Sequence, residues 1–109
     1  MNRRMLWLVP MLLAFSAPGV RAYTATGMGL MPCGVWTLIR GTETPPKMEA
    51  QQWVAGYLSG IRFVREKGAD PLKGKSHDSV MVWIDDYCRT TPNSPIMDAA
   101  NAFYREYLR

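Results

Sequence analysis

Residues 47–67 form the longest stretch of regular hydrophobic spacing in the chain. Apolar residues recur there at intervals of three and four, as the buried face of an α-helix requires. They are Ala50, Trp53, Val54, Tyr57, Leu58, Ile61 and Val64. The polar residues expected on the opposite face are Glu49, Gln51, Gln52, Ser59, Arg62, Arg65 and Glu66. In a chain of 109 residues, such a helix predicts one small domain with a helical core.

Two glycines, Gly56 and Gly60, lie four residues apart inside this predicted helix. Each glycine destabilises a helix interior by about 1 kcal/mol relative to alanine. We expect such a pair where a second helix approaches closely. Gly68 is a suitable end of the helix, because glycine accepts the left-handed conformation common at that position.

Three more helices are predicted around the long one. A short helix follows Pro32, is ended by Gly41, and contains Cys33, Val35, Trp36, Leu38 and Ile39. Residues 42–47, which include two adjacent prolines, form a turn-rich connector.

The third helix follows a polar loop over residues 69–75, and either Ser76 or Asp78 caps its start. Its expected buried face is Val80, Trp83, Ile84, Tyr87 and Cys88, while Asp78, Asp85 and Asp86 are expected to face outward. The last helix begins with Ser94 as the N-cap and Pro95 as the first helical residue, and it runs to Leu108. Its apolar stripe is Ile96, Ala100, Phe103 and Tyr107.

No segment alternates with period two, so no sheet is expected. The predicted fold is an all-α, single-domain bundle of about four helices over residues 32–109. Residues 23–31, which contain threonine and glycine but no hydrophobic period, are expected to form a flexible N-terminal arm.

The first 22 residues have the layout of a secretory signal peptide. Arg3 and Arg4 precede an apolar run, which is shorter than the ~20 residues that a membrane-spanning helix needs. Val20 and Ala22 stand at the −3 and −1 positions of a cleavage site. We therefore predict export to the periplasm, without a membrane anchor after cleavage.

Cleavage would also remove most of the positive charge. Three of the 13 basic residues lie in the leader, which leaves ten against nine acidic residues, a net charge of about +1. Nucleic acid is therefore not an expected partner, because there is no basic excess to replace the counterions on phosphates.

Cys33 and Cys88 both lie outside the predicted leader. An even number of cysteines in a small exported domain favours one disulfide. A catalytic redox pair fits less well, because the sequence has no Cys-x-x-Cys motif. Free thiols at a reactive site are the third interpretation.

No constellation of residues indicates catalysis or metal binding. His77 is the only imidazole and is expected to be solvated beside Asp78. The neighbours Asp85 and Asp86 would point in different directions on a helix, so they cannot share a proton as a catalytic pair. We predict no enzyme, no cofactor, no metal and no catalytic residue.

Aromatic residues give the one general indication of function. A domain this small cannot bury all of its large aromatic side chains, so some of them form a contact surface for a partner protein or for a second copy in a homodimer. The candidates are Trp36, Trp53, Tyr57, Trp83 and Tyr87.

Three segments are similar to the HdeA/HdeB family of periplasmic acid-stress chaperones. They are Cys33-Gly34-Val35-Trp36, the helix Trp53-Val54-Ala55-Gly56-Tyr57 with Ser59-Gly60, and Val82-Trp83-Ile84-Asp85-Asp86-Tyr87-Cys88. The resemblance implies a Cys33–Cys88 disulfide in a small helical fold. It also implies partial unfolding in acid, which exposes apolar surface that holds unfolded periplasmic proteins. Protonation of all nine carboxylates would raise the charge from about +1 to about +10, and such self-repulsion loosens compact states.

A second resemblance implies a different partner. The run Gly56-Tyr57-Leu58-Ser59-Gly60-Ile61 is similar to a helix motif of the periplasmic immunity proteins that block peptidoglycan amidase effectors of type VI secretion. Those proteins are also small, helical and disulfide-bonded. On this alternative, the chain binds one cognate effector tightly at neutral pH.

Overall fold

The computed structural model describes residues 27–66 and 70–109, and most of these residues are helical. The elements are η1 (Gly27–Leu30), α1 (Cys33–Arg40), α2 (Pro45–Glu66), α3 (His77–Thr90), α4 (Ile96–Phe103) and η2 (Tyr104–Leu108). Over these residues the β-structure is limited to one isolated bridge, between Pro32 and Pro95. The prediction of an all-α bundle of about four helices is confirmed. The predicted signal peptide and residues 23–26 of the predicted arm lie outside the described residues.

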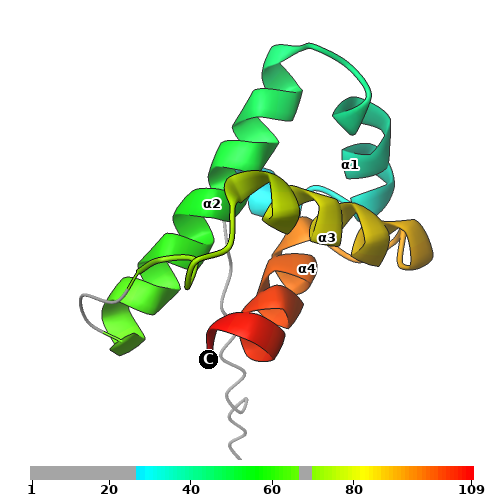
Figure 1. Ribbon diagram of the computed structural model, residues 1–109. Coiled ribbons are helices and arrows are strands. Elements are labelled where there is room, and N and C mark those ends of the chain that lie inside the picture. Colours follow the sequence, from blue (N-terminus) through cyan, green and yellow to red (C-terminus); the bar gives the residue numbers. More distant parts are fainter. Residues whose placement is uncertain (1–26, 67–69) are drawn as a thin grey trace, which may run out of the picture.

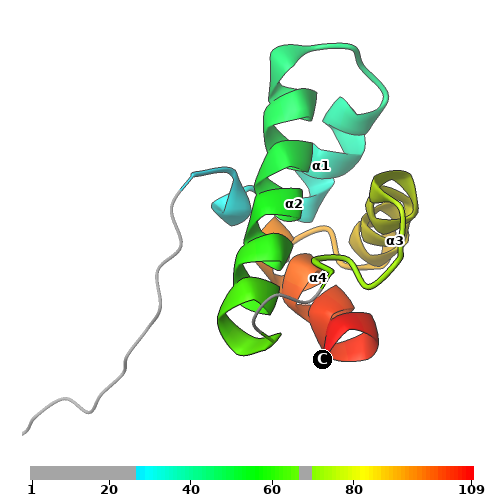
Figure 2. The ribbon, with the colours of Figure 1, turned by 60° about the vertical axis from the view of Figure 1, so that its left-hand side comes forward.

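The helices form three layers around one core. Helices α1 and α4 lie between α2 on one side and α3 on the other (Figures 1 and 2). The largest side chains buried among them are Trp36, Phe103, Leu58, Met81 and Ile84. This arrangement leaves the outer side of α2 uncovered over its C-terminal half.

Residues 27–31 differ from the expected flexible arm. Gly27–Leu30 is one turn of 3-10 helix that packs against α2 and α4, and Met28 and Met31 lie against the core. Gly29 is buried beneath the Trp53 indole so closely that a Cβ atom there would overlap the ring. The turn is fixed because Trp53 needs a cover that the helices themselves do not supply.

The predicted disulfide is confirmed and joins α1 to α3 through Cys33 and Cys88, which are 55 residues apart in sequence. Two backbone hydrogen bonds tie the same region to the start of α4. The amide of Cys33 donates to the carbonyl of Ser94 at 2.7 Å, and the amide of Ile96 donates to the carbonyl of Met31 at 2.9 Å. The start of α1 therefore meets the end of α3 and the start of α4, which are distant from it in sequence, at one end of the core.

Helix α2 begins two residues earlier than predicted, because both prolines of the expected connector occupy its first turn, where no backbone N–H donor is required. The assignment of its two faces was wrong near the C-terminal end. Val64 is 71% exposed, whereas Arg62 is only 4% exposed. The Arg62 guanidinium enters the core because it donates to the carbonyl oxygens of Leu108, at 2.7 Å, and Asp70, at 2.9 Å.

Of the two caps predicted for α3, Ser76 and Asp78, the structure has Ser76, whose hydroxyl accepts from the amide of Ser79 at 3.1 Å. Asp85, expected to face outward, instead turns toward α1. The last helix begins one residue later than predicted: Pro95 is the capping residue, and the Ser94 side chain makes no cap. It also changes at Tyr104 from α- to π-helical hydrogen bonding.

Candidate functional site

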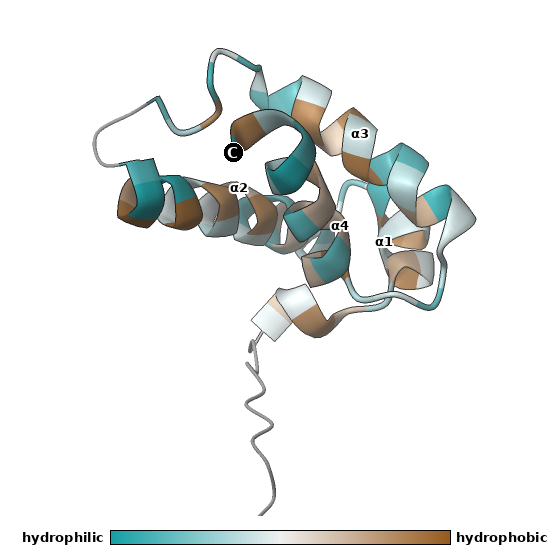
Figure 3. Cartoon of the chain, turned by 90° about the horizontal axis from the view of Figure 1, so that it is seen from below, coloured by the Kyte–Doolittle hydropathy of each residue, from teal (hydrophilic) through white to brown (hydrophobic). Residues whose placement is uncertain are grey.

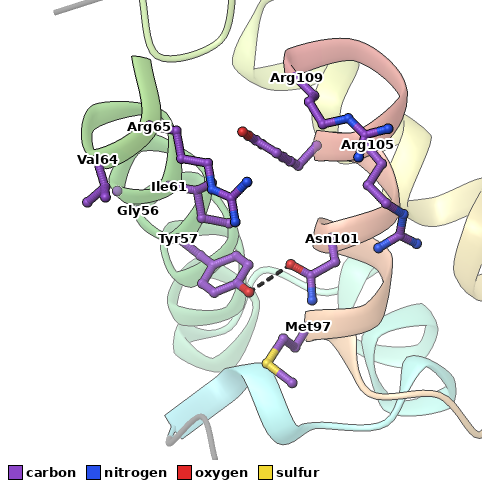
Figure 4. Close-up of a pocket in the computed structure, with 11 residues that line it drawn as sticks. Gly56, Tyr57, Ile61, Val64, Arg65, Met97, Asn101, Arg105 and Arg109 are labelled. Carbon is purple, nitrogen blue, oxygen red and sulfur yellow. Dashed lines mark hydrogen bonds between the residues drawn. The ribbon is translucent and has the colours of Figure 1, made fainter. Parts of the chain in front are cut away.

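An open groove of about 810 Å³ runs between α2 and the segment formed by α4 and η2 (Figure 4). One wall comes from the exposed face of α2, and the other from consecutive turns of the C-terminal segment. The lining residues are Gly56, Tyr57, Gly60, Ile61, Val64, Arg65, Met97, Asn101, Tyr104, Arg105 and Arg109. Of the five aromatic residues predicted for protein binding, only Tyr57 lines it.

Gly56 and Gly60 belong to the α2 rim of this groove, and Figure 4 shows Gly56 on the side of α2 away from the C-terminal segment. The expectation that a second helix packs against the pair was wrong. A Cβ atom built on Gly56 or on Gly60 meets no described atom within 4 Å. Each glycine therefore destabilises the helix by about 1 kcal/mol relative to alanine without a packing gain inside the described fold. Because neither glycine has a side chain, the α2 wall of the groove is low at these two positions and the α2 backbone is accessible.

The groove is apolar near its Met97 end, where α2 and α4 are joined by one hydrogen bond. The Tyr57 hydroxyl donates to the Asn101 side-chain oxygen at 2.7 Å (Figure 4). The Tyr57 ring is held by stacking on Trp53, with the ring centroids 4.7 Å apart. Because the stack and the hydrogen bond fix this ring from two sides, the apolar end of the groove is preformed.

Three arginines line the groove. Arg65 of α2 and Arg109 lie at the end opposite Met97, whereas the Arg105 guanidinium lies on the outer side of the C-terminal segment and points away from α2 (Figure 4). The Arg65 guanidinium lies 5.7 Å from the centre of the Tyr104 ring, so it reaches across the groove. Arg105 and Arg109 are four residues apart at the end of the predicted last helix, and this spacing is the sequence signal that could have identified the cationic end.

Tyr104 contributes a polar atom that has no partner. The residue is 5% exposed and lines the groove, and its hydroxyl is buried without a hydrogen bond to any described group. Buried hydroxyl groups are nearly always hydrogen-bonded in folded proteins. Within the described residues, the Tyr104 hydroxyl is therefore a hydrogen-bonding group without a protein partner beside the groove.

Apolar surface continues beside the groove. Phe63 is 72% exposed and Val64 is 71% exposed, both on the last turns of α2. Figure 3 shows hydrophobic bands along α2, one of them at its C-terminal end. Two large, mostly exposed apolar residues next to an open groove are typical of a contact surface for another protein.

The other predicted aromatic residues are distributed over the molecule. Trp36 has no exposed surface, so the folded protein cannot use it in a contact surface. Trp83 and Tyr87 stack on α3 with centroids 5.8 Å apart, and Trp83 also packs edge-on against Phe103. Helical spacing alone could not separate the core aromatics from those at the surface.

Asp85 joins α1 to α3 at a second point besides the disulfide. Its carboxylate accepts from the Trp36 indole N–H, from Arg40 Nε and from Arg40 Nη2, each at 2.7 Å. The same guanidinium donates through Nη1 to Gln51 of α2 at 2.7 Å. Hydrogen bonding to Asp85 raises the pKa of Arg40, against the opposing effect of burial. Arg40 and Asp85 therefore organise three helices through charge-assisted hydrogen bonds.

His77 is the only histidine of the chain. The ring of His77, at the start of α3, lies 3.8 Å from the Asp78 carboxylate. Within residues 27–66 and 70–109, no group of three or more His, Cys, Asp or Glu residues is placed to hold a metal ion. Among the helices in that part of the chain, none has both the length and the apolar character needed to cross a membrane.

No family model matches the chain, and no curated protein or solved structure shows significant similarity to it. The functional argument therefore rests on the groove and on the chemistry of its lining.

Proposed function

We propose that this protein is a non-catalytic binding domain that recognises a partner protein, in its folded state, through the groove between α2 and α4. The observation that carries this proposal is the pair Gly56 and Gly60, which faces open space in the middle of the longest helix. A helix that needed only to fold would gain stability from alanine at both positions. A partner segment in the groove could contact the accessible α2 backbone together with the fixed aromatic ring and the exposed apolar side chains beside it.

We propose further that the protein acts in the periplasm after removal of residues 1–22. The Cys33–Cys88 disulfide supports this location, because structural disulfides persist in oxidising compartments and are rare in the cytosol. Recognition by the folded state is also what the resemblance to immunity proteins implies. An amidase effector encoded beside this gene would be the first partner to test.

A Gly60→Leu variant tests the groove directly. The leucine side chain would fill the open space, while the free energy of unfolding should rise by about 0.5–1 kcal/mol, because leucine is a far better helix former than glycine. Random peptides displayed on phage would be selected on the wild-type protein at neutral pH, and the enriched peptides tested on both proteins. We expect the variant to be more stable in urea and to lose these peptides.

Gly41→Leu provides a matched control. Gly41 ends α1 with φ −87°, which any residue adopts, and a Cβ there also meets open space. This variant should keep the selected peptides. Selection of no peptide, or of peptides that bind the Gly60→Leu variant equally well, would refute recognition through the groove. Sedimentation of the wild type at several concentrations would detect a homodimer that uses the same surface.

A second candidate function is the acid-stress chaperone, and the observation in its favour is the bonding of Asp85. Loss of the Arg40–Asp85 ion pair would weaken the link between α1 and α3. Residues of the core would then become accessible to unfolded clients, while the disulfide limits the expansion of the chain. The groove is already open in the folded state, so it favours neutral-pH recognition over this second function.

Light scattering by an aggregating client protein tests the chaperone function. The wild-type protein should suppress aggregation at pH 2–3 and leave it unchanged at pH 7. An equal amount of a helical protein without chaperone activity serves as the control. Equal scattering with and without the protein at low pH would eliminate this function.

A further inference from the structure

We infer that the groove binds an acidic peptide segment, in which apolar side chains lie over the Gly56 end and one or more carboxylates reach the arginine end. This inference rests on the proposed function, because it specifies the chemistry of the partner at the same groove. It is carried by the charges of the lining and by the unpaired Tyr104 hydroxyl.

The charged side chains that line the groove are all positive. Arg65, Arg105 and Arg109 line the groove, whereas no Asp or Glu does. All nine acidic residues of the chain lie in the described part, and the ion pairs found there use none of these three arginines. Three guanidinium groups without an acidic side chain as partner are therefore available to an external anion. Guanidinium groups bind carboxylates through paired N–H donors.

The Tyr104 hydroxyl gives independent support for a polar ligand atom at this place. Tyr104 is only 5% exposed, and its hydroxyl oxygen has no described partner. Its ring is the one that Arg65 covers. A carboxylate that draws the Arg65 guanidinium away from this ring would uncover the hydroxyl and could accept its hydrogen, which would satisfy the group.

The arrangement of the lining explains why the ligand should be a peptide segment with two different ends. Tyr57, Asn101 and Met97 lie at one end of the groove, while Arg65 and Arg109 lie at the other (Figure 4). The glycine pair lowers the wall of the apolar end, so side chains of a bound segment can lie on the α2 backbone. A small inorganic anion would use the arginines alone and leave the apolar end empty.

Fluorescein-labelled heptapeptides test this inference with the full-length mature protein. The probes are Glu-Glu-Ala-Leu-Phe-Ala-Leu and Leu-Ala-Phe-Leu-Ala-Glu-Glu, because the direction of the bound chain is open, and their neutral twins carry Gln for Glu. Fluorescence anisotropy at neutral pH should show one acidic probe binding about tenfold more tightly than its twin. This preference should decrease between about 50 mM and 500 mM salt, since salt screens exposed charges.

An Arg105→Gln/Arg109→Gln variant should lose the preference for the acidic probe and keep its weak affinity for the neutral twin. Arg89→Gln is the matched control, because Arg89 is an exposed arginine on α3, paired with Asp86 and absent from the groove. Equal binding of acidic and neutral probes, both abolished by Gly60→Leu, would overturn the acidic ligand and leave the groove intact. Absence of binding by all four probes would also overturn it, while the phage selection decides the proposed function separately.

Discussion

Removal of the Cys33–Cys88 disulfide is expected to lower the free energy of unfolding by about 4 kcal/mol, the value that chain entropy gives for a loop of 55 residues. Small domains are stable by only about 5–15 kcal/mol, so this bond contributes a large share. The thermal midpoint should therefore fall by more than about 15 °C. Thermal unfolding of the Cys33→Ala/Cys88→Ala variant, followed by circular dichroism, would measure the effect.

The wild-type protein treated with a reductant provides the comparison for this variant. Both cysteines are almost completely buried, so alanine also removes sulfur atoms from the core, whereas reduction removes only the bond. We expect both samples to unfold far below the oxidised protein. A midpoint that neither reduction nor substitution changes would show that the bond does not stabilise the domain.

Substitution of Asp85 by alanine is expected to lower the free energy of unfolding by about 2–4 kcal/mol at neutral pH. The Trp36 indole N–H has no access to water, because Trp36 is 0% exposed, so it would be left buried without an acceptor. The partly exposed Arg40 would lose two charge-assisted hydrogen bonds and regain part of their energy from water. Urea unfolding followed by tryptophan fluorescence would measure the difference.

The Asp85→Asn variant separates the contribution of the hydrogen bond from Trp36 from that of the charge interaction with Arg40. Asparagine retains an oxygen that can accept from the Trp36 indole but has no charge for Arg40, so the loss should be about half that of Asp85→Ala. An alanine variant as stable as the wild type would show that this link between α1 and α3 contributes nothing. Equal losses in both variants would assign the whole effect to the charge.

The helices were predicted well where the hydrophobic spacing is regular and where the residues that begin or end a helix act only on their sequence neighbours. The start of α3 at Ser76 and the end of α1 at Gly41 are examples, because a capping side chain and a glycine act on their own neighbours. The Cys33–Cys88 pairing was also predictable, since a chain with two cysteines allows only one intramolecular bond.

The faces of the helices were predicted less well. Arg62 has the charge of a surface residue, yet it is buried, because its guanidinium donates to the carbonyl oxygens of Leu108, in the distant C-terminal segment, and of Asp70, in the loop after α2. Asp85 turns inward for a similar reason, since Trp36 and Arg40 of α1 lie opposite it. Such residues gain partners that no local pattern can reveal.

In the candidate site, too, some features follow from neighbouring residues and others only from contacts between distant segments. The sequence by itself determined that the chain is helical, that its two cysteines can pair and that Gly56 and Gly60 share one face of a helix, because these properties depend on neighbouring residues and on covalent chemistry. Only the tertiary structure decided that this face lies open beside α4, and that Arg65 shares a groove with Arg105 and Arg109. The reason is physical: side chains about 40 residues apart in sequence share a surface only after the helices have packed against a common core.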